Sequence, residues 1–452
     1  LSLAGSGRAR ADWLVGINMT RACTLMNRRH SGVLSVGRVQ TPTLRLIVDR
    51  DREISQFVPH PFWRVDVRLQ EGDCAFLAQW QPDETSCDSE GRCIRESAAR
   101  TAAGCLAQAS TAQVQNITIQ RMKEAPPLAF TLSVLQQTCS KLWGMGAQQV
   151  LDIAQRLDEI HKATTYPRTD CGWLPVSMHD EAPQVLAALV TSDASLSGIV
   201  NQLNPLQRSR IWNDGKITAH HGIIPTRQTV DLARMSDNER KVYGLIRNHF
   251  LAQFLPDYEA DKTELCLNCA GETLEAKGTT PVVSGWRQLF MRELDESKPE
   301  ETQCIPALSQ GQTCDVEQVD IRARQTQPPE HYTEGTLIAA MKNAARFVAD
   351  ERLKQRLKEN AGIGTEATRA GIIQTLLKRG YLEKRRRFLL ATDTARTLID
   401  TLPDTLKDPG TTALQEQRLD EVAAGKMTLE EFMTQQQHTV MALVTQLTTS
   451  PA

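Results

Sequence analysis

The order of helical and strand-forming segments is the feature that most constrains the fold of this 452-residue chain. Residues 58–118 and about 256–326 contain short runs in which polar and apolar residues alternate, as is typical of strands. The segments before, between and after them carry apolar residues at helical spacing. This order predicts a multidomain α+β protein in which two distant sheet segments pair across an inserted helical domain.

The same order predicts three domains, which the length allows at roughly 150 residues per domain. We expect residues 1–57 and 327–452 to join in one helical domain, the base domain. Residues 58–118 and 251–326 would form a β-rich arch or hinge domain. Residues 119–250 would form a second helical domain.

Charge is distributed unevenly along a chain that is nearly neutral. The formal net charge is −2, from 52 basic and 54 acidic residues, which argues against a general binder of polyanions. However, residues 1–57 contain nine Arg and four acidic residues, and residues 341–388 contain thirteen Lys or Arg and five acidic residues. Because both segments belong to the expected base domain, we predict a localised anion-binding surface there.

Composition excludes several other classes of protein. Hydrophobic residues make up 40% and charged residues 23%, as in globular rather than disordered or fibrous chains. No apolar run approaches the roughly 18 residues that span a bilayer, so we expect no membrane segment. The 11 cysteines are scattered, which favours free thiols in a reducing compartment. Cys266 and Cys269 form a CxxC pair, but they lie in an alternating segment that would place them on opposite faces, so a zinc site is the weaker interpretation.

The sequence TTYPRTD, residues 164–170, carries the strongest chemical signal. Pro167 disfavours a helical conformation at Tyr166, and residues two apart share a face in an extended chain. Tyr166, Arg168 and Asp170 would therefore project together. A phenol beside a guanidinium suits attack on a phosphodiester, with the tyrosine oxygen as nucleophile and the arginine holding the phosphate. Local geometry alone favours the alternative of a tyrosine in a turn beside a surface Arg–Asp pair.

The sequence AHHGIIPT, residues 219–226, is a second candidate. His220 and His221 are adjacent and poorly spaced to chelate one metal ion. One imidazole could instead donate to a phosphate oxygen or relay a proton. Solvated loop histidines are an equally good interpretation.

Two further segments could hold a sugar-phosphate backbone. In SVGRVQT, residues 35–41, Gly37 allows close approach of a ligand, and Arg38 and Gln40 could share a face, although a turn with Thr41 as the cap of a helix is the simpler interpretation. In GIGTEATR, residues 362–369, glycines lead to Thr365 as the expected cap of a helix ending near Gly380. A helix N-terminus with Thr hydroxyls and an arginine can bind phosphate, and a capped surface helix is the alternative.

Asp49, Asp51 and Glu53 match the pattern DxDxE, which can hold Mg²⁺ when it follows a strand. Here the pattern continues a predicted helix that starts near Pro42. Residues two apart lie about 200° apart around a helix, so the two aspartates cannot hold one ion. We interpret the segment as a solvated helical face.

Together and in this order, SVGRVQTPTL, TTYPRTD, AHHGIIPT and GIGTEATRAGII resemble the motifs of the type IA DNA topoisomerases. RARADWLVGINMTRA near the start is similar to the same family, and the resemblance runs from about Arg8 to about Leu443. TYPRTD and AHHGIIPT are more similar to the bacterial topoisomerase III branch than to topoisomerase I. The resemblance implies a toroidal core in which helical domains and a β-rich arch surround a hole, and the tyrosine-bearing domain swings to open a gate.

The resemblance also implies roles for individual residues. Tyr166 matches the tyrosine that forms a 5′-phosphotyrosine with one DNA strand, Arg168 the arginine that positions the scissile phosphate, and His220 a histidine near that phosphate. The matched DNA-contacting segments contain Ser35, Arg38, Gln40, Thr365, Thr368 and Arg369.

The implied reaction is transient cleavage of one strand, passage of another and religation, which relaxes negative supercoils and decatenates DNA without ATP. The family uses Mg²⁺ held by an N-terminal Toprim domain. We expect this chain to lack that domain, so no metal ligand is assigned within it. The expected partners are single-stranded and negatively supercoiled DNA and a separately encoded Toprim domain, in the cytoplasm at the nucleoid and away from membranes.

Two alternatives remain at this point. Without a Toprim domain, the chain could be a non-catalytic fragment that binds single-stranded DNA. A tyrosine recombinase or relaxase is a weaker alternative, since relaxases generally need a three-His metal cluster and the sequence contains one adjacent His pair and scattered single His residues.

Overall fold

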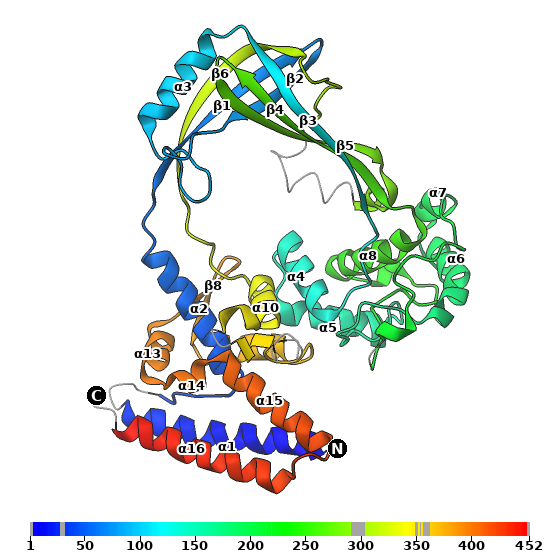
Figure 1. The fold of residues 1–452 in the computed structure, drawn as a ribbon. Coiled ribbons are helices and arrows are strands. Elements are labelled where there is room, and N and C mark those ends of the chain that lie inside the picture. Colours follow the sequence, from blue (N-terminus) through cyan, green and yellow to red (C-terminus); the bar gives the residue numbers. More distant parts are fainter. Residues whose placement is uncertain are drawn as a thin grey trace.

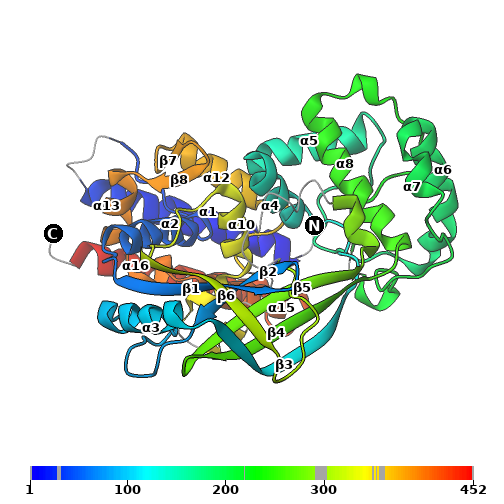
Figure 2. The ribbon, with the colours of Figure 1, turned by 90° about the horizontal axis from the view of Figure 1, so that it is seen from above.

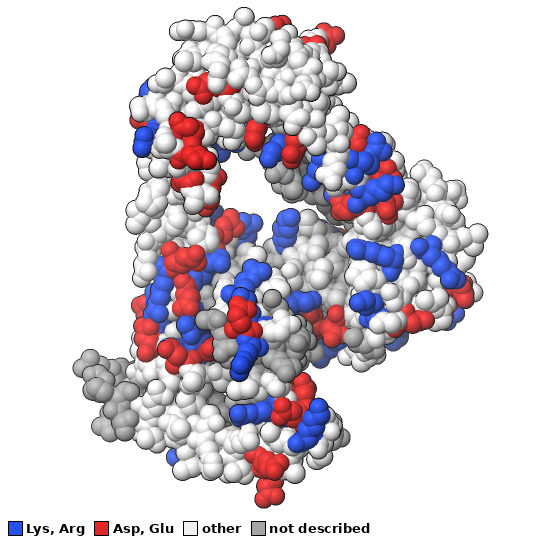
Figure 3. Space-filling model, viewed as in Figure 1, with Lys and Arg blue, Asp and Glu red and all other residues white. Residues whose placement is uncertain are grey.

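The chain forms a ring in a computed structural model. The structure describes residues 3–27, 32–217, 219–290, 303–348, 351–352, 354–355 and 362–449. A β-barrel lies at the top of the ring, one helical domain at its side and a larger helical domain at its base (Figure 1). The space-filling view shows an open hole between the barrel and the two helical parts (Figure 3). The expected α+β class and ring shape are therefore present.

Six strands of the described part close the barrel in the order β1-β2-β5-β4-β3-β6, with antiparallel pairing throughout. They are β1 (Pro61–Glu71), β2 (Cys74–Trp80), β3 (Thr111–Glu124), β4 (Tyr258–Cys269), β5 (Glu272–Val283) and β6 (Thr313–Gln325). Strands from the two distant sheet segments are thus combined in one barrel. β6 closes it by pairing with both β1 and β3.

Alternation along the strands explains the core of the barrel. On β4, Leu265, Leu267 and Cys269 are buried while the residues between them face outward, as a period of two requires. Cys266 and Cys269 consequently lie on opposite faces, as the sequence pattern predicts. Helix α3 (Glu96–Gln108) packs its buried small and apolar side chains, including Leu106, against the same core.

The base domain is built from both ends of the chain around one hydrophobic core. Its helices are α1 (Leu3–Met26), α2 (Gln40–Ser55), α10 (Glu334–Lys342), α12 (Arg369–Lys378), α13 (Asp393–Thr401), α14 (Asp404–Lys407), α15 (Pro409–Ala423) and α16 (Leu429–Thr449). The sequence around KRRRFLLAT, residues 384–392, predicts a hairpin, and strands β7 (Leu382–Arg385) and β8 (Phe388–Ala391) form it. Within the described ranges, no helix has the length and apolar character needed to cross a membrane.

The second helical domain has its own core and lies to one side of the ring when seen from above (Figure 2). Its helices are α4 (Leu132–Trp143), α5 (Ala147–Glu159), α6 (Ala182–Ser192), α7 (Ser197–Val200) and α8 (Asp237–Leu251). Short 3₁₀ helices in the described ranges are η1 (Val176–Glu181), η2 (Ala194–Leu196), η3 (Asp214–Lys216), η4 (Leu232–Arg234), η5 (Ala252–Phe254), η6 (Gly285–Phe290) and η7 (Ala344–Phe347).

Three helix ends differ from the sequence-based expectation. Helix α2 begins at Gln40, before the expected cap Thr41. The apolar spacing in QQVLDIAQRLDEIHK, residues 148–162, predicts that Ile160 lies on the buried side of α5, but the helix ends at Glu159 and Ile160 is 57% exposed. Helix α12 begins at Arg369 rather than after Thr365, because residues 366–368 form a turn.

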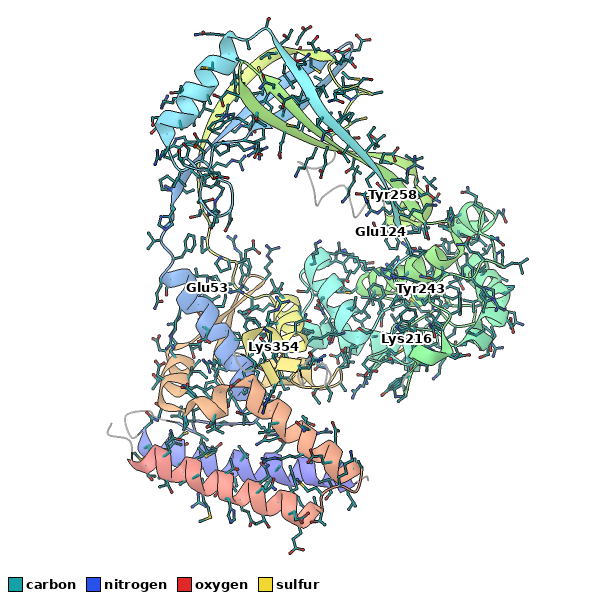
Figure 4. The ribbon with its side chains drawn as sticks, viewed as in Figure 1. Glu53, Glu124, Lys216, Tyr243, Tyr258 and Lys354 are labelled. Atoms are coloured by element: carbon teal, nitrogen blue, oxygen red, sulfur yellow. The ribbon has the colours of Figure 1, made fainter. Side chains whose placement is uncertain are left out.

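The chain crosses each junction of the ring twice, because the helical domain is inserted into the barrel and the barrel into the base. At the junction between barrel and helical domain, Glu124 ends β3 and Tyr258 begins β4 (Figure 4). The Trp286 indole donates to the Glu124 carbonyl at 2.8 Å, and the Arg287 guanidinium lies 3.9 Å from the Tyr258 ring centroid. These contacts hold the two crossing strands together where they leave the barrel.

We expect Leu267→Ala to lower the free energy of unfolding of the barrel by about 2–5 kcal/mol, because the side chain is fully buried and its loss leaves a cavity. Leu77→Ala on β2 is the control. That residue is 46% exposed, and its substitution should change stability by no more than about 0.5 kcal/mol. Urea titrations followed by tryptophan fluorescence compare the two; equal losses would contradict this description of the core.

Candidate functional site

The segment that contains Tyr166 is held in an extended conformation by a second segment. The backbone N–H of Thr165 donates to the carbonyl of Ile224 at 2.9 Å, and that of Thr226 donates to the carbonyl of Ala163 at 3.0 Å. The Thr165 hydroxyl also accepts from the Ile224 N–H at 3.0 Å and donates to the Gly222 carbonyl at 3.2 Å. Two motifs about 55 residues apart in the sequence therefore form one short antiparallel pair.

Exposure alternates along the Tyr166 segment, as an extended chain requires. Tyr166 is 46% exposed, Pro167 is buried, Arg168 is half-buried, Thr169 is buried and Asp170 is exposed. This alternation is the pattern expected if Tyr166, Arg168 and Asp170 share one face, and that shared face stays a prediction.

His220 is the histidine that meets the tyrosine. The rings of Tyr166 and His220 are 4.8 Å apart between centroids, at an interplanar angle of 42°. His221 instead turns to its own chain, with Nδ1 2.9 Å from the Gly222 carbonyl oxygen. The phenol and the imidazole of His220 are thus brought together by two adjacent segments.

Gly222 makes this pairing possible because its lack of a Cβ lets the backbone pack closely against Ala129. A Cβ atom built at Gly222 would lie 2.6 Å from the Cβ of Ala129. Its N–H donates to the Trp173 carbonyl, and the next N–H, of Ile223, donates to Phe130, both at 2.9 Å. A larger residue would push the His220 segment away from this support.

The end of α5 is anchored directly before the Tyr166 segment. Arg156 Nε donates to Glu239 at 2.6 Å, and His161 Nε2 lies 3.4 Å from the same carboxylate oxygen. Glu239 also accepts from the Ser236 backbone N–H, which caps α8. Burial alone would raise the pKa of Glu239, but the hydrogen bonds from Ser236 and Arg156 outweigh it and lower the pKa to about 2.

A groove of about 720 Å³ opens on the base domain, between α1, the 35–40 segment and the 362–368 segment. Of the sequence-predicted DNA ligands, Ser35, Gln40, Thr365 and Thr368 line it with half-buried or exposed side chains. Trp13 of α1 also lines the groove and is 66% exposed. Sequence reasoning missed Trp13; an aromatic residue among polar and basic neighbours in RARADWLV was the signal that could have indicated it.

Arg38 lines the same groove but is already paired within the protein. It is 7% exposed, with Nε 2.7 Å from Asp12 and Nη1 2.9 Å from Glu416. Burial by itself lowers the pKa of Arg38, but the two carboxylates outweigh it and raise the pKa above its usual value. The role of Arg38 in this arrangement is to organise the groove wall, and its expected contact with DNA stays a prediction.

Arg369 is placed differently from a surface ligand. The side chain is 1% exposed, and its guanidinium donates to Ser133 of the helical domain, to Glu366 and to two backbone carbonyls. Burial lowers the pKa of Arg369, and the carboxylates of Glu366 and Asp170 act in the opposite direction. Direct contact of Arg369 with DNA would therefore require the two domains to separate; it also stays a prediction.

The DxDxE segment does not form a metal site. Asp49 pairs with Arg45 and Glu53 with Arg50 along α2, as expected for a solvated face. Asp51 departs from that expectation, because it is buried and accepts from the Ala391 N–H while contacting His331. Glu53 also lies across the ring from the domain that carries Tyr166 (Figure 4). Within the described part, no cluster of three His, Cys, Asp or Glu side chains could hold a metal ion.

Comparison with known proteins identifies the family of this chain. A sequence model of the DNA topoisomerase family matches residues 1–434. DNA topoisomerase 3 of Pasteurella multocida is 41% identical over 453 residues, covering 96% of this chain and 69% of the relative. DNA topoisomerase 3 of Vibrio cholerae is 40% identical over 460 residues, covering 100% of this chain and 71% of the relative.

The ring shape also has a structural counterpart. Full-length topoisomerase I from Thermotoga maritima superposes with a TM-score of 0.74 at 24% identity, covering 98% of this chain and 68% of that chain, which shows a common fold. The chain belongs to the type IA DNA topoisomerase family, so the family, fold class and enzyme class expected from the motifs are confirmed. These relatives do not favour the alternative of a non-catalytic fragment.

We expect Glu239→Gln to remove a pH-dependent part of the stability of the tyrosine domain. Since the pKa of Glu239 falls from 4.5 to about 2 on folding, its stabilisation is present above pH 4.5 and is lost as the pH falls through about 2. We expect a contribution of about 2–3 kcal/mol. Urea titrations at several pH values between 5 and 2 measure it, with the exposed Glu159→Gln as control. An unchanged pH dependence in Glu239→Gln would rule this out.

Proposed function

We propose that this chain carries the strand-cleaving tyrosine of a topoisomerase III-type enzyme and that Tyr166 is the nucleophile. The observation that carries the proposal is the half-exposed Tyr166 ring against His220, and the half-buried Arg168 lies two residues further along the segment. In the reaction, the phenol oxygen forms a bond to phosphorus and loses its proton, and the bond from phosphorus to the 3′-oxygen breaks. The product is a 5′-phosphotyrosine and a free 3′-hydroxyl, and religation reverses both steps.

Arg168 and His220 fit the phosphate in this scheme. A guanidinium can donate two parallel hydrogen bonds to phosphate oxygens and stabilise the charge that develops on them. The imidazole of His220 can donate to a phosphate oxygen or exchange a proton with the reacting oxygens. Retention of the phosphate ester energy in the phosphotyrosine makes ATP unnecessary, in accord with the absence of a Walker motif from the sequence.

The groove on the base domain would hold the single-stranded part of the substrate. Ser35, Gln40, Thr365 and Thr368 offer hydroxyl and amide groups that suit a sugar-phosphate backbone. The indole of Trp13 offers a surface on which a base can stack. Both properties favour unpaired DNA of any sequence, as found where negative supercoiling opens the duplex.

The described residues do not fit a Mg²⁺ site, so no step of the reaction is assigned to a metal ion within them. We infer that Mg²⁺ is held by a Toprim domain, on the same polypeptide or encoded separately, which is then a partner of the ring. The enzyme would act in the cytoplasm on DNA of the nucleoid, where it would relax negative supercoils and decatenate DNA.

We expect Tyr166→Phe to abolish strand cleavage in the ring joined to the Toprim domain of a relative. The substitution keeps the ring and removes only the nucleophilic oxygen. Covalent complexes with labelled single-stranded DNA and relaxation of a supercoiled plasmid should both vanish, while DNA binding persists. Tyr243→Phe in buried α8 is the matched control and should retain activity. Covalent complexes formed by Tyr166→Phe would overturn the assignment.

The 452-residue chain without a Toprim domain should bind but not relax DNA.

We expect Trp13→Ala to weaken binding of single-stranded DNA by the chain, because a stacked base contributes about 1–3 kcal/mol. Leu25→Ala is the control, since Leu25 is 68% exposed on the same helix but does not line the groove. Fluorescence anisotropy with a labelled oligonucleotide measures both. Binding should weaken in salt, and equal affinities of the two variants would exclude stacking on Trp13.

A further inference from the structure

Two buried glutamates lie at the contact between the base domain and the domain that carries Tyr166. Glu334 is the first residue of α10 and is 3% exposed, and Glu366 lies shortly before α12 and is 8% exposed. Neither belongs to the proposed catalytic or DNA-binding set. A buried carboxylate is unfavourable unless it is paired and hydrogen-bonded, so the partners of these two groups define what they do.

Glu334 caps a helix of the other domain. Its Oε2 accepts the backbone N–H of Ala147 at 2.7 Å, and Ala147 is the first residue of α5. The residue before it, Gly146, has no side chain with which to cap the helix, and a Cβ there would lie 3.1 Å from Glu334 Oε1. Oε1 in turn accepts from Lys384 at 2.9 Å. The base domain thus supplies the cap that the sequence of α5 lacks.

Glu366 makes the equivalent contact with α4. Its Oε2 accepts the backbone N–H of Ser133 at 2.6 Å, and its Oε1 accepts from Arg369 at 2.9 Å. Arg369 also donates to the Ser133 hydroxyl at 3.0 Å. A carboxylate at a helix N-terminus is favoured both by the free N–H groups and by the helix dipole.

The α4 contact continues to the catalytic segment. The N–H of Leu132, directly before Ser133, donates to the carbonyl of Thr169 at 3.0 Å. Thr169 lies three residues after Tyr166 on the same extended segment. The base domain is therefore connected to the Tyr166 segment through Glu366, the start of α4 and this backbone hydrogen bond.

We propose that Glu334 and Glu366 form a latch that holds the Tyr166 domain closed on the base domain, and that both caps are released together when the DNA gate opens. Helices α4 and α5 share one hydrophobic core, so a movement of the domain away from the base removes both N-termini from their carboxylates at once. In the open state the carboxylates would be solvated. The link between this latch and opening of a DNA gate rests on the proposed function, whereas the joint release of the two caps does not.

Hydrogen–deuterium exchange of the 452-residue chain, followed by mass spectrometry of peptides, tests the latch. We expect Glu334→Gln and Glu366→Gln each to speed exchange by about 10-fold, since a neutral acceptor makes a weaker hydrogen bond than a carboxylate. The faster exchange should occur at the starts of both α4 and α5 in either variant. Peptides from the middle of α8 and from β4 should keep their wild-type rates.

Exposed Glu159→Gln on α5 is the charge-matched control and should change neither helix start. Faster exchange only at the helix next to the substituted glutamate would show two independent caps and reject the latch, as would unchanged exchange at both. If a glutamine variant unfolds, exchange will be fast in α8 as well. Lys384→Gln then tests the latch by the same criteria. It removes the ion pair with Glu334 by changing a half-exposed residue rather than the buried carboxylate. Tyr166→Phe should leave exchange unchanged, so failure of the latch and failure of the proposed chemistry are distinguishable.

Discussion

The backbone pairing between residues 163–165 and 222–226 is the interaction on which the site depends. It keeps the Tyr166 segment extended, so that alternate side chains share a face, and it brings His220 against the tyrosine ring. Pro167 favours the extended conformation locally, but the hydrogen bonds of Thr165 hold it in place. The lack of a Cβ at Gly222 lets this pair pack on Ala129. Thr165 and Gly222 therefore help to position the Tyr166 side chain through the backbone.

Charge acts in this ring through local pairing rather than through a large basic field. Lys and Arg are interspersed with Asp and Glu over the face shown in Figure 3. In the groove, Arg38 is paired with Asp12 and Glu416, and Arg8 also pairs with Glu416. A DNA phosphate would enter a groove whose arginines already have partners. In the proposed function, a chain with a net charge of −2 would therefore bind DNA there mainly through hydroxyls, amides and stacking.

The sequence predicts secondary structure and local chemistry better than it predicts exposure. Strand alternation and the 382–391 hairpin are confirmed, because each depends on neighbouring residues in the chain. Arg38, Asp51 and Arg369 are different: their motifs indicated surface groups, and all three are buried. Arg38 and Asp51 have partners tens to hundreds of residues away, and Arg369 adds the distant Ser133 to its local partner Glu366. No local pattern reports such distant partners.

The sequence by itself determined the α+β class, the interleaved order of the segments and the family, because hydrophobic periodicity and motif order are properties of the chain. Only the tertiary structure decided that six strands close into a barrel, that His220 rather than His221 meets Tyr166, and that Glu334 and Glu366 cap helices of the other domain. The physical reason is that these outcomes depend on contacts between residues far apart in sequence. Such contacts form only when the barrel and both helical domains have packed, because each domain except the inserted one is built from two separate parts of the chain.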